Sequence, residues 1–282
     1  MSKATRREFL TSLGAAVIAG TIPPGDRAGA EEQQPIPSSG LPYTMGMASY
    51  TFRAFPTEKV LAMTARLGLR GLTLKDMHLP LQSSESEIKA ILSQISSAGL
   101  VLNSAGVVYM KTEEEIRNAF AYAKMAGLKF LVGVPEKPLL KVAEHYVKQS
   151  GIALAIHNHG PTDQQYPGPE SIYSQIGDMD KRMGLCIDIG HTQRMGLDPS
   201  VDLERFFDRV LDLHIKDVTS ADAGGKTVEM GRGVIDIPKF LRTLTRIRYS
   251  GTIHFEFEKD EKDPLPGVAE SVGYVRGILA AM

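Results

Sequence analysis

Residues 112–134 read TEEEIRNAFAYAKMAGLKFLVGV, and this stretch decides the fold. Thr112 is followed three residues later by Glu115, a spacing typical of a helix start because each side chain can bond the other's backbone N–H. A helix-type segment continues to Ala126, and Gly127 stands where a left-handed helix end favours glycine. The apolar run 128–134 then predicts a buried strand. The stretch therefore predicts helix, glycine and strand in immediate succession.

The same succession recurs along the chain from residue 43 onward. Gly68, Gly99 and Gly151 also stand between a helix-type segment and a strand-type run. We expect strands at 45–50, 69–75, 100–107, 128–134, 152–157, 183–188, 210–216 and 251–257. We expect helices at 57–67, 84–98, 112–126, 136–150, 169–176, 199–208, 237–247 and 268–281.

Strict alternation of strand and helix over residues 43–282 predicts one α/β domain, a single (β/α)8 TIM barrel. A doubly wound open sheet is the alternative. Such a sheet often carries a Gly-rich phosphate turn after its first strand, and no G-x-G-x-x-G follows residues 45–50. No linker divides this part of the chain into two domains.

The first thirty residues predict an export signal. Arg6-Arg7 precedes an apolar run over 13–22, and residues 28–30 read Ala-Gly-Ala, a small-residue cleavage pattern. The apolar run is too short to span a bilayer as a stable helix. We therefore expect a twin-arginine signal peptide at 1–30, a flexible lead-in at 31–42, and a periplasmic protein that is free of the membrane after cleavage. A cytoplasmic protein with a disordered start is the alternative.

Composition excludes several classes of partner. The chain of 282 residues is 43% hydrophobic and 23% charged, as expected of a globular protein. Its net charge of −1 lacks the basic excess of a nucleic-acid or membrane-surface binder. Cys186 is the single cysteine, so an internal disulfide is excluded. We expect a small-molecule partner and no nucleic acid, and composition leaves homo-oligomer formation open.

Ionisable residues gather at the C-terminal ends of the last four predicted strands, where TIM barrels carry their chemistry. Side chains alternate along a strand, so the apolar positions face the helices and the intervening positions face the barrel interior. One register per strand brings His157, Asp188, His214 and Glu256 to the interior near this end. Burying them unpaired would cost roughly several kcal/mol each, whereas one divalent cation satisfies all four. Two imidazoles and two carboxylates suit Mn²⁺, Zn²⁺, Co²⁺ or Fe²⁺ better than Ca²⁺ or Mg²⁺.

Each of these residues taken alone has a simpler explanation. A lone inward histidine is more often a hydrogen-bonded core residue than a metal ligand, and Asp188 could accept hydrogen bonds from backbone amides. The coincidence of four such residues on successive strands favours the metal. Cys186 lies one layer deeper than Asp188, and we expect it to serve packing.

These residues lie in motifs that resemble the xylose-isomerase-like barrel superfamily of sugar-phosphate isomerases and epimerases. The resemblance extends over the chain after Tyr43 and is carried by Asn158-His159-Gly160, Cys186-Ile187-Asp188-Ile189-Gly190-His191, Leu213-His214-Ile215-Lys216-Asp217, Gly231-Arg232-Gly233 and Phe255-Glu256. Such families bind one divalent metal through Glu, Asp, His and Glu of strands five to eight. The resemblance therefore implies Asp188, His214 and Glu256 as ligands. It also implies substrate contacts by His159, His191, Lys216 and Arg232.

His157 departs from this family pattern, since the family usually has glutamate there. An imidazole can hold the metal, but it cannot simply replace a carboxylate that serves as one of two bases in an epimerase. The second predicted strand adds Lys75 and His78 near the same end. We expect Glu256, His157 and Lys75 to be catalytic and His78 to contact the substrate. Alternatively, Lys75 pairs with Asp76 on a loop.

The resemblance implies a sugar isomerase or epimerase in which Glu256 abstracts a proton next to a carbonyl and the metal stabilises the enediolate. A lyase that performs β-elimination on a keto-sugar glycoside is one alternative, and a non-catalytic sugar-binding barrel is another. Export favours a free sugar, a keto-sugar or a glycoside as the ligand. The glycine-rich loop 217–234 could close over it.

Overall fold

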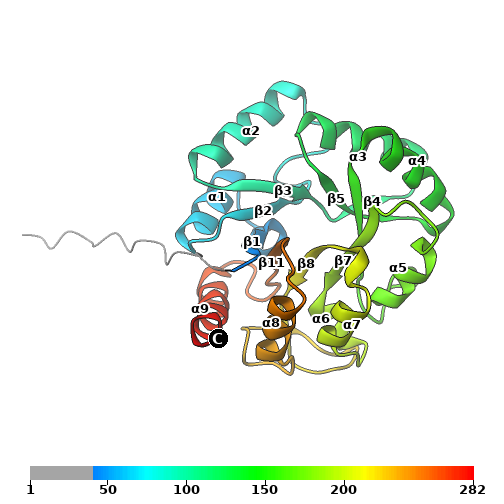
Figure 1. Cartoon of the computed structure of the whole chain (residues 1–282). Coiled ribbons are helices and arrows are strands. Elements are labelled where there is room, and N and C mark those ends of the chain that lie inside the picture. The colour runs from blue at the N-terminus through cyan, green and yellow to red at the C-terminus, as the bar shows by residue number, and fades with distance from the viewer. Residues whose placement is uncertain (1–40) are drawn as a thin grey trace, which may run out of the picture. The chain divides into compact units, whose positions relative to one another are not determined.

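The computed structural model describes residues 41–282, and these residues form a parallel strand barrel ringed by helices (Figure 1). The predicted signal peptide and most of the predicted lead-in lie outside the described residues. No helix within residues 41–282 is long and apolar enough to cross a bilayer. The barrel strands are β1 (Thr44–Ala48), β2 (Gly71–Leu74), β3 (Val101–Ala105), β4 (Val108–Met110), β5 (Phe130–Pro135), β6 (Ala153–His157), β7 (Met183–Asp188), β8 (Val210–Ile215) and β11 (Thr252–Phe255).

The helices follow the predicted succession, with one addition. They are α1 (Thr57–Arg66), α2 (Glu85–Ser97), α3 (Glu113–Met125), α4 (Leu140–Ser150), α5 (Pro169–Ile176), α6 (Ile189–Arg194), α7 (Pro199–Arg205), α8 (Ile237–Arg246) and α9 (Leu265–Ala281). The predicted capping box forms: the Thr112 hydroxyl accepts from the Glu115 backbone N–H at 3.2 Å, and the Glu115 carboxylate accepts from the Thr112 N–H at 3.0 Å. The short helix α6 was not predicted.

The strand order β3-β2-β1-β11-β8-β7-β6-β5-β4 is that of a barrel, because β1 pairs with the last strand, β11. The single strand expected at 100–107 is instead β3 followed by β4, and these halves pair with β2 and β5 respectively. The break falls at Gly106, where an added Cβ would lie 2.3 Å from the Val132 carbonyl oxygen. Only glycine allows the backbones to approach so closely, and the strand bends there.

Side chains alternate between the two faces of the strands as predicted. Leu154 and Ile156 of β6 belong to the large apolar core that packs between strands and helices. Ala155, between them, packs in a small separate cluster with Val132 and Cys186. By alternation this cluster lies on the interior face. The corresponding positions of β8 and β11 are instead polar and buried: Asp212, His214 and His254. The polar part of the interior continues to the C-terminal ends of these strands.

The segment after β8 is fixed by one buried carboxylate. It contains the antiparallel pair β9 (Asp217–Val218) and β10 (Thr227–Val228). The Asp217 carboxylate accepts backbone N–H bonds from residues 218, 231, 233 and 235 at 2.9–3.1 Å. A Cβ at Gly233 would lie 2.2 Å from Asp217 Oδ1, so glycine is needed for this approach. Both ends of the segment are therefore tied to the barrel.

Asp217→Asn removes one of the two acceptor oxygens, and about two backbone bonds of roughly 1 kcal/mol each are lost. The loss of about 2 kcal/mol corresponds to about 30-fold more frequent opening of the segment, while the barrel stays folded. Limited trypsin digestion with mass spectrometry should then show faster cleavage after Lys226 and Arg232. Asp222→Asn, in the same segment, is the control. Unchanged cleavage in Asp217→Asn would contradict the assignment.

Asp202 of α7 carries a buried carboxyl oxygen that lacks a hydrogen-bond partner among residues 41–282. Burial raises its pKa to about 6, and Arg205 only partly offsets this. The folded state therefore holds the proton more tightly than the unfolded chain. The resulting penalty is absent below pH 4, develops as the pH rises to 6, and is complete above that value.

Asp202→Asn removes this charge. The shift corresponds to about 3 kcal/mol, which partial screening by solvent and Arg205 reduces to about 1 kcal/mol. We expect that gain in unfolding free energy at pH 7.5 and none at pH 3.5, measured by urea unfolding. Asp178→Asn, at an exposed position, should show no such pH dependence. An equal gain at both pH values would mean that charge is not the cause.

Candidate metal and substrate site

Four neighbouring strands bring the predicted metal ligands to one place at the C-terminal end of the barrel. His157, Asp188 and His214 end or nearly end β6, β7 and β8, and Glu256 follows β11 directly. Each residue offers one ligand atom, and these atoms lie within 4.8 Å of one another. All four side chains are buried. They form the ligand cluster, defined here as His157, Asp188, His214 and Glu256.

The imidazoles of the ligand cluster lack protein partners. His157 Nε2 lies 3.6 Å from Asp188 Oδ2, and His214 Nδ1 lies 3.6 Å from Glu256 Oε1, distances too long for hydrogen bonds. Both ring nitrogens of both histidines are buried without a hydrogen-bond partner in residues 41–282. Orphaned buried nitrogens are costly and uncommon. Nitrogen and carboxylate donors arranged in this way could hold a transition-metal ion.

The charges around the ligand cluster fit a divalent cation. The Lys216 ammonium lies 2.9 Å from Asp188 Oδ2 and 2.6 Å from Glu256 Oε2, and it also contacts Glu258. Lys216 and the three carboxylates that it contacts together carry −3 + 1 = −2, without counting the histidines or the buried Asp212. Burial lowers the His157 pKa well below its usual value, so this ring is neutral. A divalent cation among these residues would offset part of this negative charge.

The same ion pairs hold the acids ionised. Burial alone would raise the pKa of Glu256, but Lys216 and His214 outweigh it and hold that pKa well below the usual range. Burial likewise would lower the pKa of Lys216, yet Asp188 and Glu256 raise it well above the ordinary value. Lys216 can approach because residue 190 is glycine, where an added Cβ would lie 2.3 Å from Lys216 Cγ.

Asp188 is oriented by the chain on both sides of it. Its Oδ1 accepts the His191 backbone N–H at 2.8 Å and so caps α6. Its own N–H donates to Asn158 Oδ1 at 2.9 Å. These two bonds leave Oδ2 directed at Lys216 and His157. The Asn158 and His191 positions of the sequence motifs therefore serve the geometry of Asp188.

A second carboxylate lies behind His214. Asp212 Oδ1 is hydrogen-bonded to His254 Nδ1 at 2.9 Å, and Asp212 Oδ2 lies 4.0 Å from His214 Nε2. All three residues are buried. Burial would lower the His214 pKa, but Glu256 and then Asp212 outweigh it, so the pKa is raised. The ring thus has Glu256 on one side and Asp212 on the other, and a carboxylate behind a metal-binding histidine is a common arrangement.

Two further histidines extend the site outward. The His159 ring lies 4.6 Å from that of His157 and 5.9 Å from that of His191. Its Nε2 lies 3.2 Å from the Tyr109 hydroxyl, and its Nδ1 lies 3.3 Å from Asp163 Oδ2. Burial lowers the pKa of both His159 and His191. Neutral rings with one N–H each can donate to, and accept from, sugar hydroxyls.

Lys75 approaches from the β2 side. Its ammonium donates to the Val107 carbonyl at 2.6 Å and lies 5.2 Å from the centre of the Tyr109 ring. Burial lowers its pKa, and Asp76 and then Glu256 only partly offset this. A lysine with a lowered pKa next to apolar and aromatic groups is suited to proton transfer.

The structure places two predicted substrate contacts elsewhere. Both ring nitrogens of His78 are occupied, by the Ser49 hydroxyl at 2.9 Å and the Phe55 carbonyl at 3.1 Å. His78 therefore connects the loops after β1 and β2. Arg232 is exposed and forms a two-bond ion pair with Glu270 of α9, at 2.5 and 2.8 Å. Neither residue joins the ligand cluster in this structure.

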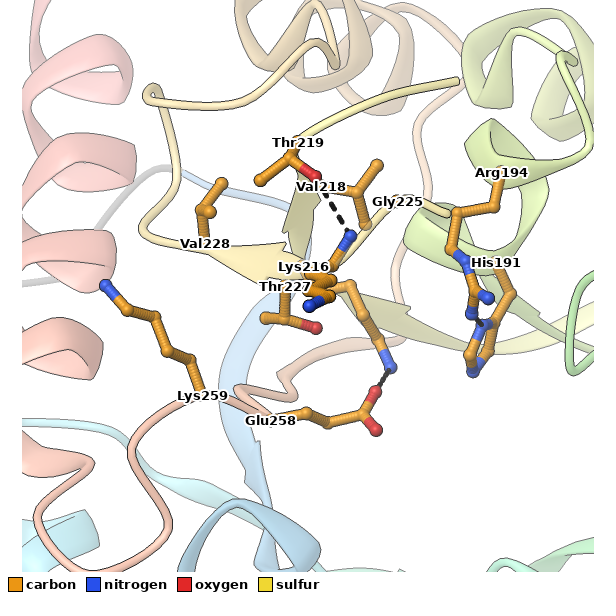
Figure 2. Close-up of a pocket in the computed structure, with 11 residues that line it drawn as sticks. His191, Arg194, Lys216, Val218, Thr219, Gly225, Thr227, Val228, Glu258 and Lys259 are labelled. Atoms are coloured by element: carbon orange, nitrogen blue, oxygen red, sulfur yellow. Dashed lines mark hydrogen bonds and ion pairs between the residues drawn. The ribbon is translucent and has the colours of Figure 1, made fainter. Parts of the chain in front are cut away.

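A pocket of about 480 Å³ opens beside the ligand cluster (Figure 2). Its wall includes Arg194, which the sequence patterns did not predict, and Glu258, which contacts Lys216 and had no predicted role (Figure 2). Arg194 lies three residues after His191, at the end of α6. Arg194 could have been predicted by treating Asp188 as a helix N-cap. A helix that starts at Asp188 brings residues 191 and 194 to one face.

Solved structures share the fold at low identity. A 3-keto-D-glucoside 4-epimerase from E. coli is 15% identical, with 83% of this chain and 99% of that chain covered and a TM-score of 0.68. An L-ribulose 3-epimerase is 15% identical, with 85% and 95% covered and a TM-score of 0.68. A protein from Sinorhizobium meliloti 1021 is 16% identical, with 84% and 98% covered and a TM-score of 0.70. These likenesses show the fold alone.

Sequence comparison gives the family. The rhizopine catabolism protein MocC of Rhizobium meliloti is 27% identical over 154 residues, which are 49% of this chain and 46% of that protein. The chain thus matches about half the length of this relative. The sequence profile described as "Xylose isomerase-like TIM barrel" matches residues 61–278, most of the chain. The chain therefore belongs to the xylose isomerase-like TIM barrel family.

Proposed function

We propose that the chain is a metal-dependent sugar isomerase or epimerase that abstracts a proton next to a carbonyl. The observation that carries the proposal is the ligand cluster, with its orphaned imidazole nitrogens and its two buried carboxylates. It lies at the C-terminal end of a TIM barrel, where such barrels perform chemistry. Two solved structures with the same fold carry the names of sugar epimerases, which supports a sugar as the substrate.

His157, Asp188, His214 and Glu256 would hold the cation, and Mn²⁺, Zn²⁺, Co²⁺ and Fe²⁺ suit this mixture of nitrogen and oxygen donors. When bound, the cation would supply a Lewis acid that lowers the free energy of negative charge developing on the substrate. Asp212, behind His214, would keep that ring oriented.

The chain's own residues supply the proton transfers. Glu256 is ionised and buried, so it can accept a proton from a carbon held beside it. Lys75, with its lowered pKa, is the partner that returns or removes a proton from the β2 side. His159 and His191 would bind substrate hydroxyls, and Lys216 would keep Glu256 in place. The buried cluster keeps bulk water away from the reacting carbon.

A lyase is the second candidate, and His157 is the observation that favours it. Epimerisation by two carboxylate bases needs a second carboxylate close to Glu256. Residue 157, where the resembled family usually has that carboxylate, is a neutral imidazole instead. One ionised carboxylate and a lysine suffice for β-elimination, in which a proton leaves one carbon and the group on the next carbon departs. A keto-glycoside has the required acidic C–H bond. One solved structure with this fold is named for a 3-keto-glucoside substrate.

We also propose that the protein works outside the cytoplasm, after export by the twin-arginine route. The support is the arginine pair, the apolar run and the Ala-Gly-Ala pattern of the first thirty residues. Because that route carries folded proteins, the metal would be bound before export.

The metal proposal predicts one transition-metal ion per chain. Elemental analysis after dialysis against Mn²⁺, Zn²⁺ or Co²⁺ should give one metal ion per protein chain. At a free metal concentration 100 times the dissociation constant, the unfolding free energy should rise by about 2.7 kcal/mol. His214→Ala should lose both effects, and His145→Ala, at an exposed position outside the cluster, should keep both. Wild-type protein that takes up no metal would remove the basis of the proposed function.

The proton-transfer proposal predicts solvent exchange at a substrate carbon. In D₂O, metal-loaded enzyme should introduce deuterium next to the carbonyl of a substrate found among free sugars, keto-sugars and 3-keto-glucosides. Lys75→Met should lower the rate by about 10²–10⁴-fold while metal content stays 1:1, and Lys59→Met on α1 should change neither. A new sugar isomer identifies an isomerase or epimerase, whereas release of the aglycone identifies a lyase. Full exchange activity in Lys75→Met would refute its catalytic role.

A further inference from the structure

Glu258 lies at the boundary between the ligand cluster and the open pocket. Among residues 41–282, Lys216 contacts three carboxylates, and Glu258 is the one that does not belong to the ligand cluster. Its side chain is 33% exposed and lines the pocket, whereas that of Glu256 is 8% exposed. The two acids are separated by one residue, and both reach the same ammonium.

The Lys216 ammonium depends on all three of these carboxylates. It has three N–H groups. It donates to Glu256 Oε2 at 2.6 Å and to Glu258 Oε1, the bond drawn as a dashed line in Figure 2, and Asp188 Oδ2 lies 2.9 Å away as an ion-pair partner. The lysine side chain is only 2% exposed, so water cannot replace these partners. A buried ammonium is stable only with such compensation.

Asp188 and Glu256 have a second role that Glu258 does not share, because both are predicted metal ligands. Asp188 Oδ2, which faces Lys216, is the oxygen left free after Oδ1 caps α6. A divalent cation held there would use the same two carboxylates as the ammonium. Two carboxylates and one divalent cation already sum to zero, so the counter-charge of Lys216 is left to Glu258. Asp212, the other buried acid of the site, is hydrogen-bonded to a histidine and not to Lys216.

Glu258 in turn has no ion-pair partner except Lys216 within the described part of the chain. Arg53 donates to the Glu258 backbone carbonyl at 3.3 Å, but its ion pair is with Glu261. In Figure 2 the Glu258 carboxylate points to the Lys216 ammonium, and the neighbouring Lys259 side chain points the other way. The carboxylate of Glu258 is therefore committed to the lysine.

We propose that Glu258 is a positioning residue that allows Lys216 and a divalent cation to occupy the site together. Its carboxylate holds the ammonium when Asp188 and Glu256 are shared with the cation, and it thereby raises the affinity of the chain for metal. Without Glu258, two cations would compete for the same two carboxylates. This inference rests on the proposed function, because it requires that the ligand cluster binds a metal.

Titration calorimetry of the metal-free full chain with Zn²⁺ tests the proposal. We expect Glu258→Gln to bind Zn²⁺ about 10- to 100-fold more weakly than the wild type, the usual effect of removing a group that supports metal ligands from behind. Glu258→Asp keeps the charge and should recover part of the affinity. Because the side chain is partly exposed, neither replacement endangers folding. Wild-type affinity in Glu258→Gln would overturn the proposal.

Glu261→Gln is the matched control for charge alone. Glu261 lies three residues further along the same segment and carries the same charge, but it is exposed and pairs with Arg53 instead of Lys216. Its replacement should change Zn²⁺ affinity little, since exposed charges are screened by salt. An equal loss in Glu261→Gln would mean that Glu258 acts only through the general field, and the positioning role would be refuted.

A double-mutant cycle with Lys216→Met shows whether Glu258 acts through the lysine. With no ammonium to hold, Glu258→Gln should have little further effect, so the double variant should bind Zn²⁺ as Lys216→Met does. The same loss from Glu258→Gln in both backgrounds would contradict the proposal. If circular dichroism shows that Lys216→Met is unfolded, the comparison of Glu258→Gln, Glu258→Asp and Glu261→Gln decides without it.

The wild-type titration separates this inference from the proposed function. A wild-type chain that binds no metal refutes both. A wild-type chain that binds one metal ion, together with a Glu258→Gln variant of equal affinity, refutes the role of Glu258 alone and leaves the proposed function supported.

Discussion

The buried ion pairs of Lys216 are the interaction on which the rest of the site depends. A lone ammonium in a barrel interior would be strongly disfavoured, and so would two adjacent carboxylates. Here Lys216 lies within 3 Å of both Asp188 and Glu256, and each group keeps the others charged. The carboxylates come from β7 and from the residue after β11, so the pairs also fix strands that are distant in sequence. Gly190 is required because any side chain there would displace the lysine.

The barrel positions this cluster through simple alternation. Leu154 and Ile156 pack outward against the helices, and this orientation forces His157 to the interior. On β5 to β7 the interior is filled by small apolar side chains, including Cys186, whose thiol pKa burial raises well above its usual value. On β8 and β11 it is filled by Asp212 and His254. The interior is thus divided into an apolar part that stabilises the fold and a polar part that supports the ligand cluster.

Sequence predicted the features that follow from periodicity. The alternating faces of the last strands predicted the four residues of the ligand cluster, and the helix, glycine and strand succession predicted the barrel. It could not predict features that depend on contacts between distant segments. The break at Gly106 arises from a close approach to Val132 on another strand. His78 was assigned to the substrate because it lies near the correct strand end, but Ser49 and Phe55 bond both its nitrogens. Arg194 was not predicted because Asp188 was interpreted only as a metal ligand. Asp188 also caps α6, and the helix that starts there brings Arg194 to the pocket.

The Asp217 carboxylate has a consequence for how this part of the molecule can vary. It accepts hydrogen bonds from the backbone amides of residues 218, 231, 233 and 235, so the chain is anchored in β9 and again between β10 and α8. We expect the exposed residues 220–224 between these anchors to accept changes in length or sequence without moving Lys216 or the ligand cluster. The residues that would hold the metal and the loop that lines the pocket are thus positioned by separate contacts, so a change in the loop can alter which ligands fit without altering the ligand cluster.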